Sequence, residues 1–404
     1  MTEFNSYRRS EDIGGPMAMG EGYRWNVPIV TYDFDSSFID YFGTNGVAAV
    51  EEVIQILNDL PPASQIVLTN YSKTYIKGNN TAQLLGLLDL KSHALALLLE
   101  QMGLASPSRW IFSPGKFIFD PQKIDWPVLM RNYDPIFLSP TNSINGQEYV
   151  YQSRVFYAPP AGYFGGFLIL AANTAYPLRT SASFLLQQVL HPPMLEGTVL
   201  LGLGQDDVGG LRYLLGTNNI QWETLLPGIH GFGTNSELAN GALRPGVEKI
   251  SFQRIGRNYG WAEGQPVATN VFVDRFWTNG VLHQQVVERY VMRPDFLFTA
   301  TNCSPNLYAR SGTGHWVNNG AVEGRDGPGV IQPPVTINFN PVSSHFATDL
   351  RVTDLIPQSI WGYFGISTNH PISYGRPAVS AGNSIFALYF LPNWSVSPAF
   401  SWKL

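Results

Sequence analysis

The acidic residues between positions 32 and 40 are the first candidates for chemistry in this chain. Asp33, Asp35 and Asp40 lie in the segment YDFDSSFID, with the closely spaced carboxylates that calcium-binding loops use. Ca²⁺ takes about six to eight oxygen ligands, many of them from carboxylates. The spacing matches no EF-hand loop, and Phe34 separates the first two aspartates. Calcium is therefore the one cofactor that the sequence leaves open, and no other is expected.

A second acidic pair, Asp206 and Asp207, opens the segment DDVGGLRYLLG, which ends in glycine and is predicted to be a short helix over 206–216. Carboxylates at the start of a helix accept hydrogen bonds from its free N–H groups and interact favourably with its dipole. We interpret the pair as helix-capping residues. Calcium binding or catalysis is the alternative.

The seven histidines do not form a local metal site. They are His93, His191, His230, His283, His315, His345 and His370. None lies two, three or four positions from another, so none forms the histidine pair that binds a metal from one strand or helix. His230 and His315 lie in glycine-rich segments predicted to be loops, where functional residues are common. His93 is expected to face the surface or to make a hydrogen bond.

Nucleophilic and nucleotide-binding motifs are also missing from the sequence. Cys303 is the single cysteine, which excludes an intramolecular disulfide and a cysteine-based zinc cluster. No G-x-S-x-G segment occurs, and GLGQDDVGG matches neither a phosphate-binding loop nor a dinucleotide fingerprint. We therefore assign no catalytic, cofactor-binding or metal-binding residue. A hydrolase whose site is assembled from distant residues stays open.

The segment Leu88–Leu104 has the pattern of a buried helix. Its apolar positions are Leu95, Leu98, Leu99 and Met102. It stops at Gly103, and glycine in the left-handed conformation is a common helix C-terminus. A helix that carries zinc needs H-E-x-x-H, because two imidazoles four residues apart face one metal. That motif does not occur here.

The elements expected around this helix suggest a mixed sheet covered by helices in the N-terminal half. They are a strand over 23–35, a helix over 46–60 capped by Thr44 or Asn45, a strand over 64–71 and the long helix over 81–102. From 108 to about 200 short β-rich runs follow, with a hairpin predicted at Asn145-Gly146. The pattern beyond 217 is almost entirely β. It includes runs at 249–255, 267–278, 284–292, 295–301, 334–342 and 384–392, and a long glycine-rich loop over 310–334.

These patterns predict an α+β protein. The expected parts are an N-terminal tail over 1–22, a mixed α/β domain over 23–217 with a β-rich insertion at about 108–200, and a β-rich domain over 218–404. The tail is polar and rich in glycine, so it buries little apolar surface of its own. We expect it to bind a neighbouring copy of the chain.

Three blocks of the chain resemble the matrixin-type metzincins. The blocks are RWNVPIVTYDFD at 24–35, the helix at 48–58 and LGQDDVGGLRYLLG at 203–216. The resemblance implies a metalloprotease-like fold for the N-terminal domain. With Gly103 aligned to the glycine of the zinc motif, Ala96, Leu97, Glu100 and Ser106 stand where that family carries His, Glu, His and His. The resemblance thus implies a scaffold that has lost its zinc chemistry.

The composition limits the classes of partner and location. Charged residues make up 14% of the chain, well below the usual quarter, and the net charge is −5. No basic cluster indicates nucleic acid as a partner. The longest apolar runs are far shorter than a membrane span, and residues 1–23 contain no apolar signal-peptide core. Either the protein is intracellular or the numbering begins at a mature start. The low charge favours an extracellular or cell-surface protein.

Three functions fit this sequence. The first is a non-catalytic, exported structural protein that self-assembles as a homo-oligomer or filament through its tail. The second is a hydrolase of peptides or glycans, and the third is a carbohydrate-binding module, since aromatic residues make up 13% of the chain. Exposed aromatic side chains on one flat sheet would favour the third. A deep pocket with paired carboxylates would favour the second.

Overall fold

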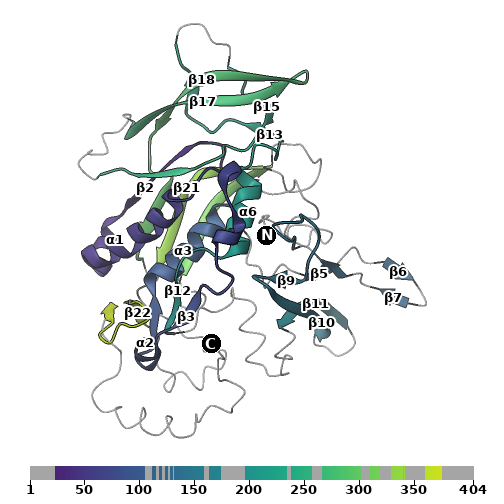
Figure 1. Ribbon diagram of the computed structural model, residues 1–404, viewed down its shortest axis with the longest axis vertical. Coiled ribbons are helices and arrows are strands. Elements are labelled where there is room, and N and C mark those ends of the chain that lie inside the picture. Colours follow the sequence, from purple (N-terminus) through teal and green to yellow (C-terminus); the bar gives the residue numbers. More distant parts are fainter. Residues whose placement is uncertain are drawn as a thin grey trace, which may run out of the picture.

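The computed structural model describes fourteen parts of the chain, and the architecture follows from them (Figure 1). They are residues 23–104, 112–114, 118–120, 123–125, 128–130, 132–158, 163–173, 196–233, 238–256, 266–301, 310–318, 329–339, 341 and 360–374. The expectations for the tail at 1–22, for Ser106, His191, Cys303 and His345, and for the strand at 384–392 lie outside these residues.

A central sheet of six strands forms the middle of the molecule. In order across the sheet its strands are β16 (Ser251–Arg254), β2 (Ile29–Phe34), β19 (Phe296–Thr299), β21 (Gly329–Phe339) and β1 (Tyr23–Arg24), with β20 (Arg310–Asn318) also paired to β21. All neighbouring pairs are parallel except β20–β21, which is antiparallel. The inner strands β2, β19 and β21 are largely buried, as expected for parallel strands that are covered on both faces.

Two helices cover one face of this sheet. The helix α1 (Ser36–Asn58) packs on β2, β16 and β19, and α3 (Leu90–Gln101) packs on α1, β20 and β21. The helix α1 begins earlier than predicted, because Asp35 caps it and Gly43, at φ 62°, joins two helical segments across a kink. The predicted start at Thr44 or Asn45 falls just after that kink. Of the apolar stripe that the sequence predicts for this helix, Val50, Ile54 and Leu57 are buried and Val47 is half-buried.

Two predictions for the segment 61–102 are wrong. The strand expected over 64–71 is instead a pair of single 3₁₀ turns, η1 (Ala63–Gln65) and η2 (Leu68–Asn70). The helix expected over 81–102 is divided into α2 (Asn80–Leu84), a short strand β4 (Leu87–Asp89) and α3. Gly86, at φ 65°, interrupts the helical conformation. Pairing with a strand about 270 residues later then holds β4 extended, which no local pattern announces.

Smaller elements surround this core. The strands β22 (Ile360–Tyr363) and β23 (Ile372–Tyr374) complete a sheet with β4, and β12 (Thr198–Leu200) pairs with β3 (Ile76–Gly78). The helix α6 (Gln205–Leu215) packs beside β1 and the 3₁₀ turns. The strands to the right in Figure 1 are β5 (Phe112–Pro114), β6 (Ile118–Asp120), β7 (Lys123–Asp125), β8 (Val128–Met130), β9 (Ser143–Ile144), β10 (Gln147–Ala158) and β11 (Tyr163–Asn173). Asn145 and Gly146, both at positive φ, form the predicted hairpin between β9 and β10.

A second sheet of five antiparallel strands lies above the central sheet in Figure 1. In order its strands are β13 (Gln221–Thr224), β15 (Gly241–Arg244), β17 (Ala268–Thr278), β18 (Val281–Val291) and β14 (Ile229–Gly231). Asn279 and Gly280, at φ 53° and 77°, make the two-residue turn between β17 and β18. That backbone twist suits paired strands and favours Asn-Gly.

The mixed α+β class is confirmed, but the central sheet joins strands from both sides of residue 217. β1 and β2 precede that position, whereas β16, β19, β20 and β21 follow it. The predicted boundary therefore does not separate two sheets. Local patterns identify a strand but not its distant parallel partner. The loop expected over 310–334 is also corrected, because β20 and the first part of β21 lie there.

Candidate functional site

The helix α3 is largely buried, including most of the positions that the metzincin resemblance assigns to zinc ligands and their neighbours. Leu95, Leu98 and Leu99 are buried as predicted, and so is Leu97. Ala96 and Glu100 are half-buried. Among the residues that the structure describes, no three His, Cys, Asp or Glu side chains are arranged to hold a metal ion.

His93 does not face the surface. It is 5% exposed, and its ring meets the Trp361 ring edge-on with 5.0 Å between centroids. The expectation of a surface-facing histidine is therefore wrong. The reason is that β22, which carries Trp361, pairs with β4 immediately before α3 and covers this side of the helix.

The candidate calcium residues lie at the carboxyl end of β2. Ligands of parallel α/β sheets commonly bind at such ends, but here the carboxylates serve the chain itself. Asp35 accepts hydrogen bonds from the Ser37 hydroxyl at 2.6 Å and from the Phe38 N–H at 3.0 Å. Asp33 is buried, with the Arg254 guanidinium 3.9 Å away, and Asp40 is exposed on α1. The three do not converge on one point.

The neighbouring strand ends are also tied to one another. The Asn338 side-chain oxygen accepts hydrogen bonds from the Thr299 hydroxyl at 2.7 Å and from the Thr301 N–H at 2.8 Å. The Asn338 amide in turn donates to the Thr301 carbonyl oxygen at 2.9 Å. These polar groups connect β19 to β21, so this edge is held together by its own hydrogen bonds.

Asp207 caps α6 as predicted. Its carboxylate accepts a hydrogen bond from the Gly204 N–H at 2.8 Å. Asp206 pairs with Asn145: its carboxylate accepts a hydrogen bond from the Asn145 N–H, and the Asn145 side-chain oxygen accepts one from the Asp206 N–H at 3.0 Å. Burial raises the pKa of both carboxyls, against the lowering effect of these backbone hydrogen bonds. The pair thus joins α6 to the β9–β10 hairpin.

A small apolar cavity lies beneath α1 and α6, between Leu57, Met102, Leu211 and Phe252. Its volume is about 20 Å³, which is room for about one water molecule. It is too small for a peptide or a sugar.

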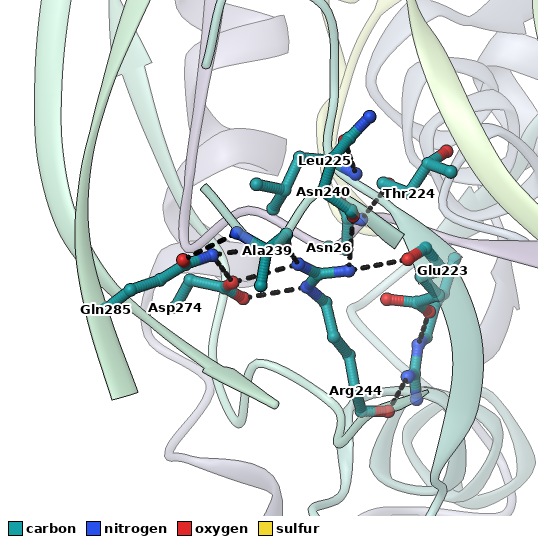
Figure 2. A network of polar contacts seen from close by, with 10 residues as sticks. Asn26, Glu223, Thr224, Leu225, Ala239, Asn240, Arg244, Asp274 and Gln285 are labelled. Carbon is teal, nitrogen blue, oxygen red and sulfur yellow. Dashed lines mark hydrogen bonds and ion pairs between the residues drawn. The ribbon is translucent and has the colours of Figure 1, made fainter. Parts of the chain in front are cut away.

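The inner face of the second sheet carries an unusual density of buried charge. Arg244 on β15 donates to both carboxylate oxygens of Asp274 on β17, at 2.9 and 3.0 Å (Figure 2). Its guanidinium also donates to the main-chain oxygens of Glu223, Ala239 and Asn240. Bidentate pairing and saturated donors are the conditions under which a buried ion pair is tolerated.

Arg24 links β1 of the central sheet to the same network. It has no exposed surface, and its Nε lies 2.6 Å from a Glu223 carboxylate oxygen. Its other donors reach the carbonyl oxygens of Leu214, at the end of α6, and of Asn219 and Arg244. Burial raises the pKa of the Glu223 carboxyl, and the Arg24 charge acts in the opposite direction. Arg24 thus positions the second sheet.

A third buried pair joins the sheets at β18. Arg289 lies 2.5 Å from Asp295, whose other oxygen accepts hydrogen bonds from the Thr31 N–H and hydroxyl at 2.8 and 2.9 Å. Thr31 belongs to β2 at the centre of the parallel sheet. The second sheet is therefore fixed to the central sheet by ion pairs rather than by an apolar layer alone.

The outer face of the second sheet is apolar and exposed. Register and burial define it as five rows that cross the strands: Trp222–Leu243–Trp277–Leu282, Arg275–Gln284, Val273–Val286–Phe232, Val271–Glu288–His230 and Thr269–Tyr290. The large apolar members other than Trp277, which is half-buried, are 39% to 53% exposed. Antiparallel sheets with one solvated face normally bury the apolar side. This sheet exposes apolar side chains on its solvated face as well, while its inner face carries the ion pairs beside buried apolar side chains such as Val287 and Val291.

No local sequence pattern predicts that this face is exposed. The segment 267–278 was expected to be a strand, and it is β17, but its alternation of apolar and polar residues does not say which side faces the body. His230 lies on the outer face in β14, its ring 5.5 Å from that of Tyr290. The expectation that His230 and His315 lie in loops is wrong, because β14 and β20 contain them.

Comparisons with protein-family models, curated proteins and solved structures give no significant match for this chain. In the part of the chain that the structure describes, no helix is both long and apolar enough to cross a membrane.

Proposed function

We propose that this chain is a non-catalytic, exported structural protein that assembles with itself. The observation that carries the proposal is the outer face. Contiguous apolar surface on a soluble chain marks a site of interaction. Burying it against a partner removes from water the side chains that the fold leaves exposed, which stabilises the complex. The buried ion pairs on the opposite side of the same sheet hold this surface in one geometry.

The charge distribution supports a protein partner. Arg275 and Glu288 are the only Lys, Arg, Asp or Glu residues in the five rows of the outer face, and the whole chain is only 14% charged. Repulsion between copies is correspondingly weak. Depletion of charge together with exposed aromatic rings is typical of the core of a protein interface.

Glycan binding is the second candidate, because Trp222, Phe232 and Tyr290 expose aromatic rings on one sheet face. Sugars stack on such rings. Aliphatic side chains, however, occupy the middle of the face at Val271, Val273 and Val286, where they offer no hydrogen-bonding group to sugar hydroxyls. The composition of the outer face therefore favours a protein over a glycan. No feature of the described residues favours a hydrolase.

We further propose that residues 23–217 retain a metzincin-like scaffold without zinc chemistry. The support is the position of α3 beside a largely parallel sheet, together with the three sequence blocks. A transition metal bound between Glu100 and a histidine, detected in purified protein by elemental analysis, would contradict the loss of zinc chemistry.

The test of assembly is the mass of the full chain in solution. Light scattering over a hundredfold range of concentration is expected to show growth beyond the monomer, with electron microscopy to separate closed oligomers from filaments. Titration with soluble oligosaccharides tests the second candidate. A chain that stays monomeric throughout, and loses sugar binding on Trp222→Ala, would replace assembly with glycan binding.

A further inference from the structure

The outer face has the pattern of charges that a two-fold contact with itself requires. Val273 and Val286 are paired at its centre. Arg275 lies one row to one side, on β17, and Glu288 lies one row to the other side, on β18. The two opposite charges therefore occupy diagonal corners around an apolar centre.

Resting on the proposed self-assembly, we infer that the occupant of the outer face is the same face of a second copy. A two-fold axis that runs across the strands above the Val273–Val286 pair brings Arg275 of each copy to Glu288 of the other. The strands of the two copies then cross at on the order of 30°, as in aligned sheet packing. Each contact occurs twice, because a two-fold interface is self-complementary.

The local environment of the two charges fits this arrangement. Arg275 is exposed and makes no ion pair with the residues that the structure describes. Glu288 is held by the Tyr290 hydroxyl, which donates to its carboxylate at 2.8 Å. The same axis places the row of Trp277 over the row of Tyr290, so aromatic rings from the two copies meet at both ends of the apolar centre.

The extent of the face suits a stable dimer. The two long strands have 11 residues each and the two shorter ones that carry Trp222 and Leu243 have 4 each. At a rise of ~3.4 Å per residue and a spacing of ~4.8 Å, they span a flat area on the order of 500 Å² before side-chain relief is counted. A standard interface buries about 800 Å² of accessible surface per partner. The flat estimate leaves out the surface of the protruding side chains and of β14 at the edge of the sheet, which add to the area that this face can bury.

A charge-reversal cycle on the full chain tests the inference. Arg275→Glu and Glu288→Arg are each expected to weaken dimerisation by at least about tenfold, because each places like charges together. The double variant is expected to recover to within about threefold of the original dissociation constant. Sedimentation equilibrium supplies these constants, and circular dichroism with thermal melting checks that each variant is folded.

Glu148→Arg is the matched control, since Glu148 is an exposed carboxylate on β10, outside the second sheet. It is expected to leave the dimer unchanged. If the full chain assembles but both reversals leave its dissociation constant unaltered, the face-to-face dimer is excluded and self-assembly stands through another surface. If the original chain is monomeric at every concentration, the proposed assembly itself fails. Weakening by both single variants without recovery in the double variant would exclude the two-fold arrangement.

Discussion

Arg24 on β1 and Glu223 on β13 form an ion pair of 2.6 Å although neither side chain has any exposed surface. Arg24 also donates to three main-chain oxygens, including that of Leu214 at the end of α6. One side chain thus joins the central sheet, the second sheet and a helix terminus. The position of the outer face depends on this connection.

Arg24→Leu is expected to lower the free energy of unfolding by about 3–5 kcal/mol, because it leaves a buried carboxylate without its partner. Urea unfolding at pH 7 measures the loss. Replacing both partners in Arg24→Leu/Glu223→Leu is expected to recover part of it. Arg293→Leu is the control, since Arg293 is exposed, lies outside the five rows of the outer face and makes no ion pair with the residues that the structure describes, and such a side chain contributes within about 0.5 kcal/mol. Equal losses for Arg24→Leu and Arg293→Leu would contradict the structural role of the buried pair.

The sequence predicted elements with strong local patterns and failed on long-range relationships. The apolar stripe of α1, the glycine after α3 and the Asn145-Gly146 hairpin are local features, and the structure confirms all three. The division of the predicted long helix into α2, β4 and α3 depends on pairing with β22, which is remote in the chain. The central sheet likewise pairs strands from the first part of the chain with strands more than 200 residues later, which no local pattern can predict. Such pairings are decided by tertiary packing rather than by local preference.

The candidate site shows the same limit. Alternation in β17 and β18 identifies two half-buried strands, but the assignment of the apolar side to the solvent comes from Arg24, Arg244 and Arg289. Their carboxylate partners lie 6 to 199 positions away. A sequence pattern places apolar residues inside by default. Only the network on the other face of the sheet reverses that expectation.

Gly103→Val is expected to destabilise the chain by more than the ~1–2 kcal/mol that the left-handed conformation alone imposes. Gly103 has φ 100°, and an added Cβ would lie 2.1 Å from the Tyr23 carbonyl oxygen. Thermal melting compares it with Gly78→Val, where a Cβ meets no atom within 4 Å and the backbone is extended. Similar melting temperatures for the two variants would show that the helix end does not need its glycine.

His93→Ala is expected to destabilise the chain by about 1–3 kcal/mol, since it removes a buried ring from its contact with Trp361. A surface histidine would have no such effect. The matched control is His370→Ala, because His370 is exposed in the turn between β22 and β23. Urea unfolding of both variants separates the two expectations, and an unchanged His93→Ala would mean that its packing contributes nothing.

Because of Asp89, the free energy of unfolding is expected to fall as the pH rises from about 4 to about 6. Burial raises the pKa of its carboxyl from 3.8 to about 6, against opposing hydrogen bonds from Ser92. The folded state therefore binds more protons than the unfolded state in this window, and stability decreases with pH. A shift of about two pKa units corresponds to at most roughly 3 kcal/mol.

Asp89→Asn isolates this contribution, because asparagine also caps a helix but does not titrate. Urea unfolding of both proteins from pH 3.5 to 7 is expected to give curves that converge at the acidic end, with the original chain losing stability relative to the variant as pH rises. Parallel curves would show that Asp89 ionises in the folded chain as freely as in the unfolded one.

Deletion of residues 1–20 is expected to stop assembly at the dimer. A two-fold contact through the outer face closes with two copies, whereas a tail that binds a neighbour adds a second contact and permits larger assemblies. Light scattering of the truncated chain should therefore give the mass of two copies, with the melting temperature of the body unchanged. Combining the deletion with Arg275→Glu should give a monomer. A truncated chain that still forms large assemblies would show that the tail is not the second contact, and a monomer from deletion alone would show that the outer face does not hold two copies together.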